Sequence, residues 1–166
     1  MGQLSGDLEA HLHEWGLRRF TSDVTYFQWQ RQALSAQDIA ALHAHAEKKR
    51  HGTSEDETAF YDLSAASRIL PVLYSQRYDY YVAIGPLVAA GLRDATTILD
   101  FGCGPGILTT FYARRLPHAR VIGLDRSRAS IAAAQRKAEV LHLENVQFEY
   151  GDLDAGIPSG TYDGIV

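Results

Sequence analysis

A glycine-rich loop carries the pattern of residues in this sequence that is best suited to binding a ligand. Gly102, Gly104 and Gly106 alternate with other residues, among them Cys103, and Asp100 precedes the first glycine by two places. Glycine tolerates positive φ angles and lets a ligand approach the backbone closely. A helix that starts after such a loop also offers free N–H groups and a partial positive charge to an anion. The stretch therefore predicts a binding loop between a strand and a helix.

The spacing of the glycines distinguishes two classes of ligand. Loops that bind dinucleotides follow the pattern G-x-G-x-x-G, whereas Ile107 stands three places after Gly104 in this chain. The carboxylate of Asp100 is poorly suited to a pyrophosphate because like charges repel, but it suits an ammonium group. We therefore expect a ligand with an ammonium, a carboxylate and a sulfonium rather than one with two phosphates.

Two further acidic residues follow apolar runs in the same part of the chain. Asp125 stands at the end of the second run and could accept both hydroxyls of a ribose. It could instead cap the next helix, although Ser127 is also suited to that role. Asp152 follows the third run and could accept a hydrogen bond from an adenine amine, with Leu153 packed on the ring, or it could be a plain turn residue. Three strand ends would then bind amino acid, ribose and base in order.

Apolar runs and helical periodicity alternate after residue 96, which predicts the elements that position these residues. The expected strands cover residues 97–101, 120–124, 146–150 and 162–166, and the expected helices cover residues 107–116 and 127–141. Alternation at this spacing predicts βαβ units, a parallel sheet and right-handed crossovers.

The chain before residue 96 is predicted to be mainly helical. Ser35 with Asp38, and Ser54 with Glu57, resemble capping boxes at helix starts. Residues 24–29 fit either a strand or a helix. Further helices are expected over residues 4–15 and 71–91, with Pro86 as a kink or restart.

Tyrosines are concentrated in one of these helical segments. Tyr74, Tyr78, Tyr80 and Tyr81 lie within eight positions of one another. Their rings could line a site for a cation, since a ring face attracts positive charge. They could instead form an aromatic face that packs against the sheet.

The histidines and the single cysteine do not predict further chemistry. His11 and His13, like His43 and His45, are two positions apart, so on a helix they point in different directions and cannot share a metal. We expect histidines at the surface and no metal site. Cys103 has no histidine nearby in the sequence to activate it, so we expect a small loop residue rather than a nucleophile.

Composition restricts the class of protein further. Hydrophobic residues make up 46% of the chain and charged residues 22%, with a net charge of −4 and a pI near 5.9. This balance is typical of a globular protein and lacks the basic excess of a nucleic-acid-binding domain. There is no apolar run of transmembrane length and no secretory signal. The single cysteine cannot form an intrachain disulfide, which fits a reducing compartment. Together these features favour a cytoplasmic protein with a small-molecule substrate.

Four motifs together resemble those of the class I S-adenosylmethionine-dependent methyltransferases. Residues 98–106 resemble the first motif of that family, residues 121–127 the second, residues 148–153 the third and residues 162–166 the fourth. The resemblance implies a Rossmann-like parallel sheet with strand order 3-2-1-4 over residues 76–166. Residues 1–75 would be a helical N-terminal segment, which could serve as a substrate lid.

The resemblance also implies roles for individual residues. Asp100, Gly102 and Gly104 would hold the methionine part of the cofactor, with Cys103 and Gly106 in the same loop. Asp125 would hold the ribose, Arg126 would lie beside the ribose or adenine, and Asp152 and Leu153 would hold the adenine. Asp163 would either face the reacting centre or be structural.

The expected reaction is methyl transfer from S-adenosyl-L-methionine to a small-molecule acceptor, leaving S-adenosyl-L-homocysteine. The alternatives are an aminopropyltransferase, an NAD(P)-dependent enzyme of related fold, and a non-catalytic binding module. No residue is identified as the general base. The family sheet has seven strands, so the resemblance implies a chain truncated after the fourth strand and inactive alone. An exposed apolar edge on that strand would favour association.

Overall fold

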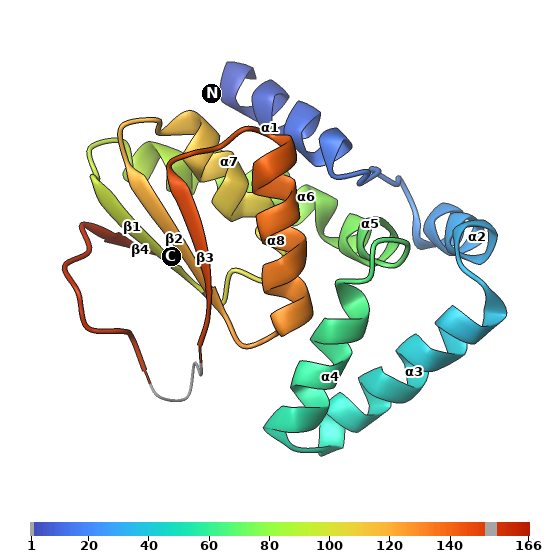
Figure 1. Cartoon of the computed structure of the whole chain (residues 1–166). Helices are drawn as coiled ribbons and strands as arrows, with labels where there is room; N and C mark the ends of the chain where they lie inside the picture. The colour runs from blue at the N-terminus through green and yellow to red at the C-terminus, as the bar shows by residue number, and fades with distance from the viewer. Residues whose placement is uncertain (1, 152–155) are drawn as a thin grey trace.

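A four-stranded parallel sheet forms the carboxyl-terminal half of the computed structural model, which describes residues 2–151 and 156–166 (Figure 1). The strands are β1 (Thr97–Phe101), β2 (Arg120–Asp125), β3 (Val146–Tyr150) and β4 (Gly164–Ile165). Their order is β3-β2-β1-β4, which confirms the predicted Rossmann-like arrangement. In the register of the sheet, Leu99 of β1 is paired with Ile122 of β2 and with Ile165 of β4.

Helices α7 (Ile107–Arg115) and α8 (Arg128–Val140) connect these strands and pack on the sheet. Right-handed crossovers between neighbouring parallel strands place successive helices on the same face. The alanines of α8 allow a close approach to that face. The shared core comprises Ile98, Ala113, Val121, Ala134, Ala138, Val146 and Phe148, all of them buried.

Seven further segments precede the sheet. They are α1 (Gly2–Glu14), α2 (Asp23–Ala33), α3 (Ala36–His51), α4 (Ser54–Ser64), α5 (Leu70–Tyr74), a 3-10 turn (Ser75–Arg77) and α6 (Tyr78–Gly91). Figure 1 shows α1 and α6 beside α7, with α2 and α3 farthest from the sheet. Helix α4 returns towards the sheet and contacts α8. No helix within the described part of the chain is both long and apolar enough to cross a membrane.

The capping patterns explain where three of these helices begin. Residues 24–29 belong to helix α2, which Ser22 caps by accepting a hydrogen bond from the backbone N–H of Thr25. The capping box of Ser35 and Asp38 is confirmed at the start of α3. The second box is one residue earlier than predicted, because Thr53 and Asp56 form it.

The predicted continuous helix over residues 71–91 is wrong, since α5, a 3-10 turn and α6 divide it. The hydroxyl of Ser75 donates to the carbonyl of Pro71 at 2.6 Å and accepts from the backbone N–H of Arg18 at 2.9 Å. A side chain bonded in this way competes with regular helical geometry. Pro86 lies inside α6 and does not restart the helix.

The prediction that the histidines lie at the surface is wrong for His11. Its side chain is fully buried where α1 packs on α7, and its Nε2 lies 2.8 Å from the carbonyl oxygen of Ile107. Burial lowers the pKa of His11 to about 4, so the ring is neutral near pH 7. Helical periodicity alone did not show that this face of α1 is covered.

Asp163 has a structural role at the edge of the sheet. Its carboxylate accepts hydrogen bonds from the backbone N–H groups of Thr96 at 2.8 Å and Thr97 at 3.0 Å. The Thr96 hydroxyl, together with these N–H groups, holds the pKa of Asp163 below its usual range. The residue thereby ties the segment before β4 to the start of β1. It does not line the cavity described below.

Candidate functional site

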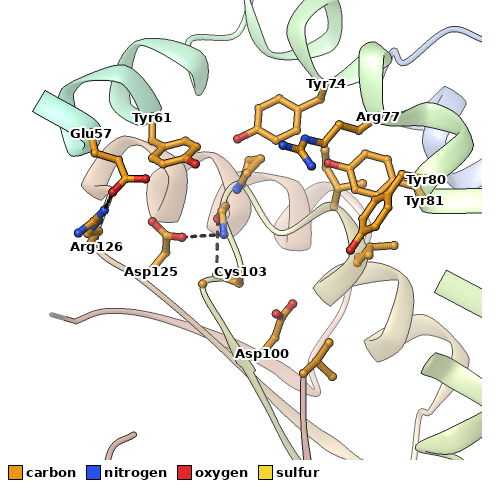
Figure 2. Close-up of a pocket in the computed structure, with 16 residues that line it drawn as sticks. Glu57, Tyr61, Tyr74, Arg77, Tyr80, Tyr81, Asp100, Cys103, Asp125 and Arg126 are labelled. Carbon is orange, nitrogen blue, oxygen red and sulfur yellow. Dashed lines mark hydrogen bonds and ion pairs between the residues drawn. The ribbon is translucent and has the colours of Figure 1, made fainter. Parts of the chain in front are cut away.

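A cavity of about 460 Å³ lies where the carboxyl ends of β1 and β2 meet the N-terminal helices (Figure 2). Its volume is within the range typical of small-molecule sites. One wall comes from the sheet and the glycine loop, and the other comes from α4, α5, the 3-10 turn and α6. The lining residues are Glu57, Tyr61, Tyr74, Arg77, Tyr80, Tyr81, Asp100, Gly102, Cys103, Gly104, Pro105, Ile107, Leu108, Asp125, Arg126 and Val166.

Asp100 forms the buried floor of the cavity at the end of β1. The Thr109 hydroxyl donates to Oδ2 of Asp100 at 2.5 Å. The other carboxylate oxygen, Oδ1, has no hydrogen-bond partner among the described residues. Burial, with a smaller contribution from the charge of Asp125, raises the pKa of Asp100 to about 6. A buried carboxylate with an open oxygen is suited to receive a cationic group such as an ammonium.

Asp125 holds the glycine loop in place. Its Oδ2 accepts a hydrogen bond from the backbone N–H of Gly104 at 2.8 Å (Figure 2). Its Oδ1 accepts one from the backbone N–H of Ser127 at 2.7 Å. Ser127 itself caps α8 by accepting from the N–H of Ser130 at 3.0 Å. Ser127, not Asp125, is therefore the N-cap of α8. Each oxygen of Asp125 keeps a lone pair that could accept from a ligand hydroxyl.

The glycines of the loop serve different purposes. Gly102 and Gly104 line the cavity, and a Cβ on Gly104, whose φ is +54°, would lie 3.7 Å from the hydroxyl oxygen of Tyr74. Gly106, by contrast, does not line the cavity. Its φ is +81°, and a Cβ there would lie 2.8 Å from atoms of both Ala134 and Phe148. Gly106 therefore lets α7 start close against α8 and β3.

Cys103 lines the cavity with a neutral thiol. Burial raises the pKa of this thiol, and the charge of Asp100 adds to the effect. The Sγ atom lies 3.0 Å from the place where a Cβ on Gly123 would stand, so the side chain fills space beside β2. These features support the prediction that Cys103 is a small loop residue rather than a nucleophile.

Three of the predicted cofactor-binding residues follow β2 and β3. Arg126 lines the cavity and forms an ion pair with Glu57 of α4 (Figure 2). Asp152 and Leu153 lie outside the described residues, so their predicted contact with an adenine stays a prediction. No group of three or more His, Cys, Asp or Glu side chains within residues 2–151 and 156–166 is placed to hold a metal ion.

Helix α4 contributes a wall that the sequence motifs do not predict. Glu57 and Tyr61 line the cavity, and the ammonium of Lys49 lies 2.6 Å from the Tyr61 hydroxyl. Asp62 fixes the helix by accepting from the Ser127 hydroxyl at 2.6 Å and from the N–H of Ala129 at 3.3 Å. The shift of the capping box to Thr53 and Asp56 leaves Glu57 free to face Arg126.

Aromatic rings form the remaining wall. Tyr74, Tyr80 and Tyr81 line the cavity, together with Arg77 (Figure 2). Burial raises the pKa of Tyr74 and of Tyr81, so both phenols stay protonated. Tyr78 points elsewhere, with its hydroxyl 3.3 Å from Nε2 of His13. Three of the four clustered tyrosines thus fit the interpretation as cavity lining, and Tyr78 fits the packing interpretation.

Comparison with known proteins finds similarity to methyltransferases. A family model described as a methyltransferase domain matches residues 92–166. The (S)-tetrahydroprotoberberine N-methyltransferase of Eschscholzia californica is 35% identical over 77 residues, which are 46% of this chain and 22% of that protein. The trans-aconitate 2-methyltransferase of Deinococcus radiodurans is 41% identical over 71 residues, which are 43% of this chain and 25% of that protein.

A solved structure of coclaurine N-methyltransferase, bound to N-methylheliamine and SAH, aligns with 99% of this chain and 43% of its own chain, at 18% identity and a TM-score of 0.49. The chain spans about a quarter of the length of the first curated relatives that it matches. A methyltransferase-domain model thus matches residues 92–166, and the sheet order β3-β2-β1-β4 matches the fold of the class I S-adenosylmethionine-dependent methyltransferases.

Proposed function

We propose that this chain binds S-adenosyl-L-methionine in the cavity and takes part in methyl transfer to a small-molecule acceptor. The observation that carries the proposal is the placement of Asp100, the glycine loop and Asp125 around one cavity. These groups come from the ends of two neighbouring parallel strands, where ligands bind in open α/β sheets. Their order along the cavity matches an amino acid followed by a ribose.

The residues present fit such a cofactor. The open oxygen of Asp100 would accept a hydrogen bond from the ammonium, and the backbone of Gly102 and Gly104, which lines the cavity, would leave room for the methionine chain. Asp125 would accept the ribose hydroxyls, with Arg126 beside them. When bound, the cofactor supplies a methyl group on a sulfonium. The chain's own contribution is to align donor and acceptor within a cavity of limited volume.

The two parts of the chain would share this work. In our proposal residues 76–166 form the cofactor domain, and residues 1–75 supply a wall through Glu57 and Tyr61 and so limit access. A small acceptor is supported by the size of the cavity and by the small molecules named for two relatives, a tetrahydroprotoberberine and trans-aconitate. We also propose a cytoplasmic location, which is supported by the single free cysteine.

Calorimetric titration tests the choice of cofactor. We expect S-adenosylhomocysteine to bind with one site per chain and NADH to produce no heat of binding. Asp100 disfavours a pyrophosphate, and the glycine spacing is not that of a dinucleotide loop. If NADH binds and S-adenosylhomocysteine does not displace it, the result contradicts the proposal and favours the alternative of an NAD(P)-dependent enzyme.

The buried carboxyl of Asp100 predicts a pH dependence of cofactor binding. A pKa of about 6 means that the group is mostly protonated at pH 5 and ionised at pH 7. A ligand ammonium stabilises the ionised form, so affinity for S-adenosylhomocysteine should rise about tenfold between pH 5 and pH 7 and then level off. Calorimetry at several pH values measures this change.

Two comparisons separate Asp100 from other titrating groups. The variant Asp100→Asn should bind S-adenosylhomocysteine more weakly at pH 7, and its affinity should not rise between pH 5 and pH 7. The wild type should show no such slope with 5′-methylthioadenosine, which lacks the ammonium. An unchanged slope in the variant would mean that Asp100 does not meet the ammonium.

A further inference from the structure

The charged groups that line the cavity differ in whether they already have partners. Glu57 is paired with Arg126, and both oxygens of Asp125 accept backbone hydrogen bonds. Asp100 accepts from a threonine hydroxyl. Arg77, by contrast, has no hydrogen-bond or ion-pair partner among the described residues. Its guanidinium therefore stands in the cavity wall as a cation without a counter-ion.

The groups beside the Arg77 guanidinium are uncharged aromatic rings. Figure 2 shows its guanidinium beside the rings of Tyr74, Tyr80 and Tyr81, on the side of the cavity opposite Glu57 and Arg126. The positive charge is close enough to act on the phenols of Tyr74 and Tyr81, yet burial keeps both protonated. Neutral rings cannot neutralise the guanidinium, but their faces can pack on a planar apolar group.

We propose that Arg77 binds a carboxylate of the methyl acceptor, and that the three tyrosines hold a flat apolar part of the same molecule. This inference rests on the proposed function and names the class of its acceptor. A guanidinium matches a carboxylate with two parallel hydrogen bonds. A singly charged carboxylate also fits better than a dianionic phosphate, because three carboxylates already line the cavity. By binding Arg77, the carboxylate orients the acceptor in the cavity.

The first test compares an acid with its neutral analogue. With S-adenosylhomocysteine bound, we expect cinnamate to bind at least tenfold more tightly than cinnamamide, which has the same shape without the charge. Ligand-observed NMR titration measures both. The variant Arg77→Gln should abolish this preference and Arg77→Lys should keep part of it. Arg93→Gln is the matched control, because Arg93 is exposed, pairs with Asp94 and lies outside the cavity.

A second arm identifies which carboxylate Arg77 binds, since the cofactor carries one too. We expect Arg77→Gln to leave the affinity for S-adenosylhomocysteine within about twofold of the wild type. If that affinity falls tenfold while 5′-methylthioadenosine binds as before, Arg77 holds the cofactor, and the acceptor assignment is overturned. Equal binding of cinnamate and cinnamamide, or no binding of cinnamate, overturns it as well.

The outcomes also separate this inference from the proposed function. A wild-type chain that fails to bind S-adenosylhomocysteine contradicts the proposed function itself. A wild-type chain that binds it normally but shows no preference for the acid contradicts only the role of Arg77. Circular dichroism melting of each variant confirms that the chain is folded, as expected for changes at an exposed side chain.

Discussion

Replacing Asp125 by alanine is expected to weaken the binding of S-adenosylhomocysteine by about 100-fold. The carboxylate would accept two charge-assisted hydrogen bonds from the ribose, and bonds of that kind contribute about 1.5–3 kcal/mol each. The change also removes the acceptor for the Gly104 N–H, which lies 2.8 Å away and fixes the binding loop. Calorimetric titration measures the loss.

Two variants calibrate that result. Asp125→Asn keeps one side-chain oxygen as an acceptor, so a loss of about tenfold is expected. Asp94→Asn alters an exposed carboxylate that pairs with Arg93 outside the cavity, and affinity should not change. An Asp125→Ala protein that is folded and binds S-adenosylhomocysteine like the wild type would remove Asp125 from the site.

Replacing Gly106 by alanine is expected to lower the free energy of unfolding by about 2–4 kcal/mol. The residue has a φ of +81°, a backbone conformation that residues other than glycine rarely adopt. A Cβ would also lie 2.8 Å from the Ala134 Cβ and from a ring carbon of Phe148. Relief of that overlap requires α7 to move away from α8 and β3. Such a loss is a large fraction of the stability of a typical domain.

Gly91 is the matched control for this change. It lies at the end of α6 with no positive φ, and a Cβ there would meet no atom within 4 Å. Gly91→Ala should therefore leave stability unchanged or raise it by up to about 1 kcal/mol, since alanine favours a helix. Urea unfolding followed by circular dichroism compares the two variants. Equal stability of Gly106→Ala and the wild type would mean that α7 does not start in the described position.

The sheet and the floor of the cavity could be predicted from the sequence because their signals are local. Each buried strand is a short apolar run followed by a loop, and Asp100, Gly104 and Asp125 stand at fixed places after those runs. Parallel strands bring such ends to one edge of a sheet. Even so, the sequence did not show that Gly106 packs against Phe148 rather than lining the cavity, since that contact joins distant segments.

The opposite wall of the cavity could not be predicted because it depends on the path of the helical segment. Glu57 and Tyr61 line the site on a helix whose Asp62 bonds the start of α8, 65 residues away in the chain. Arg77 belongs to the 3-10 turn Ser75–Arg77, in which the Ser75 hydroxyl accepts from the backbone N–H of Arg18, 57 residues away in the chain. No local pattern of residue types records either contact.

A crystal structure of the chain with bound S-adenosylhomocysteine tests the central claim most directly. The account predicts that both ribose hydroxyls lie about 3 Å from the carboxylate oxygens of Asp125. The ammonium should lie against Asp100, with the homocysteine chain over Gly102 and Gly104. A ligand bound with its ribose away from Asp125, or outside this cavity, would contradict the account.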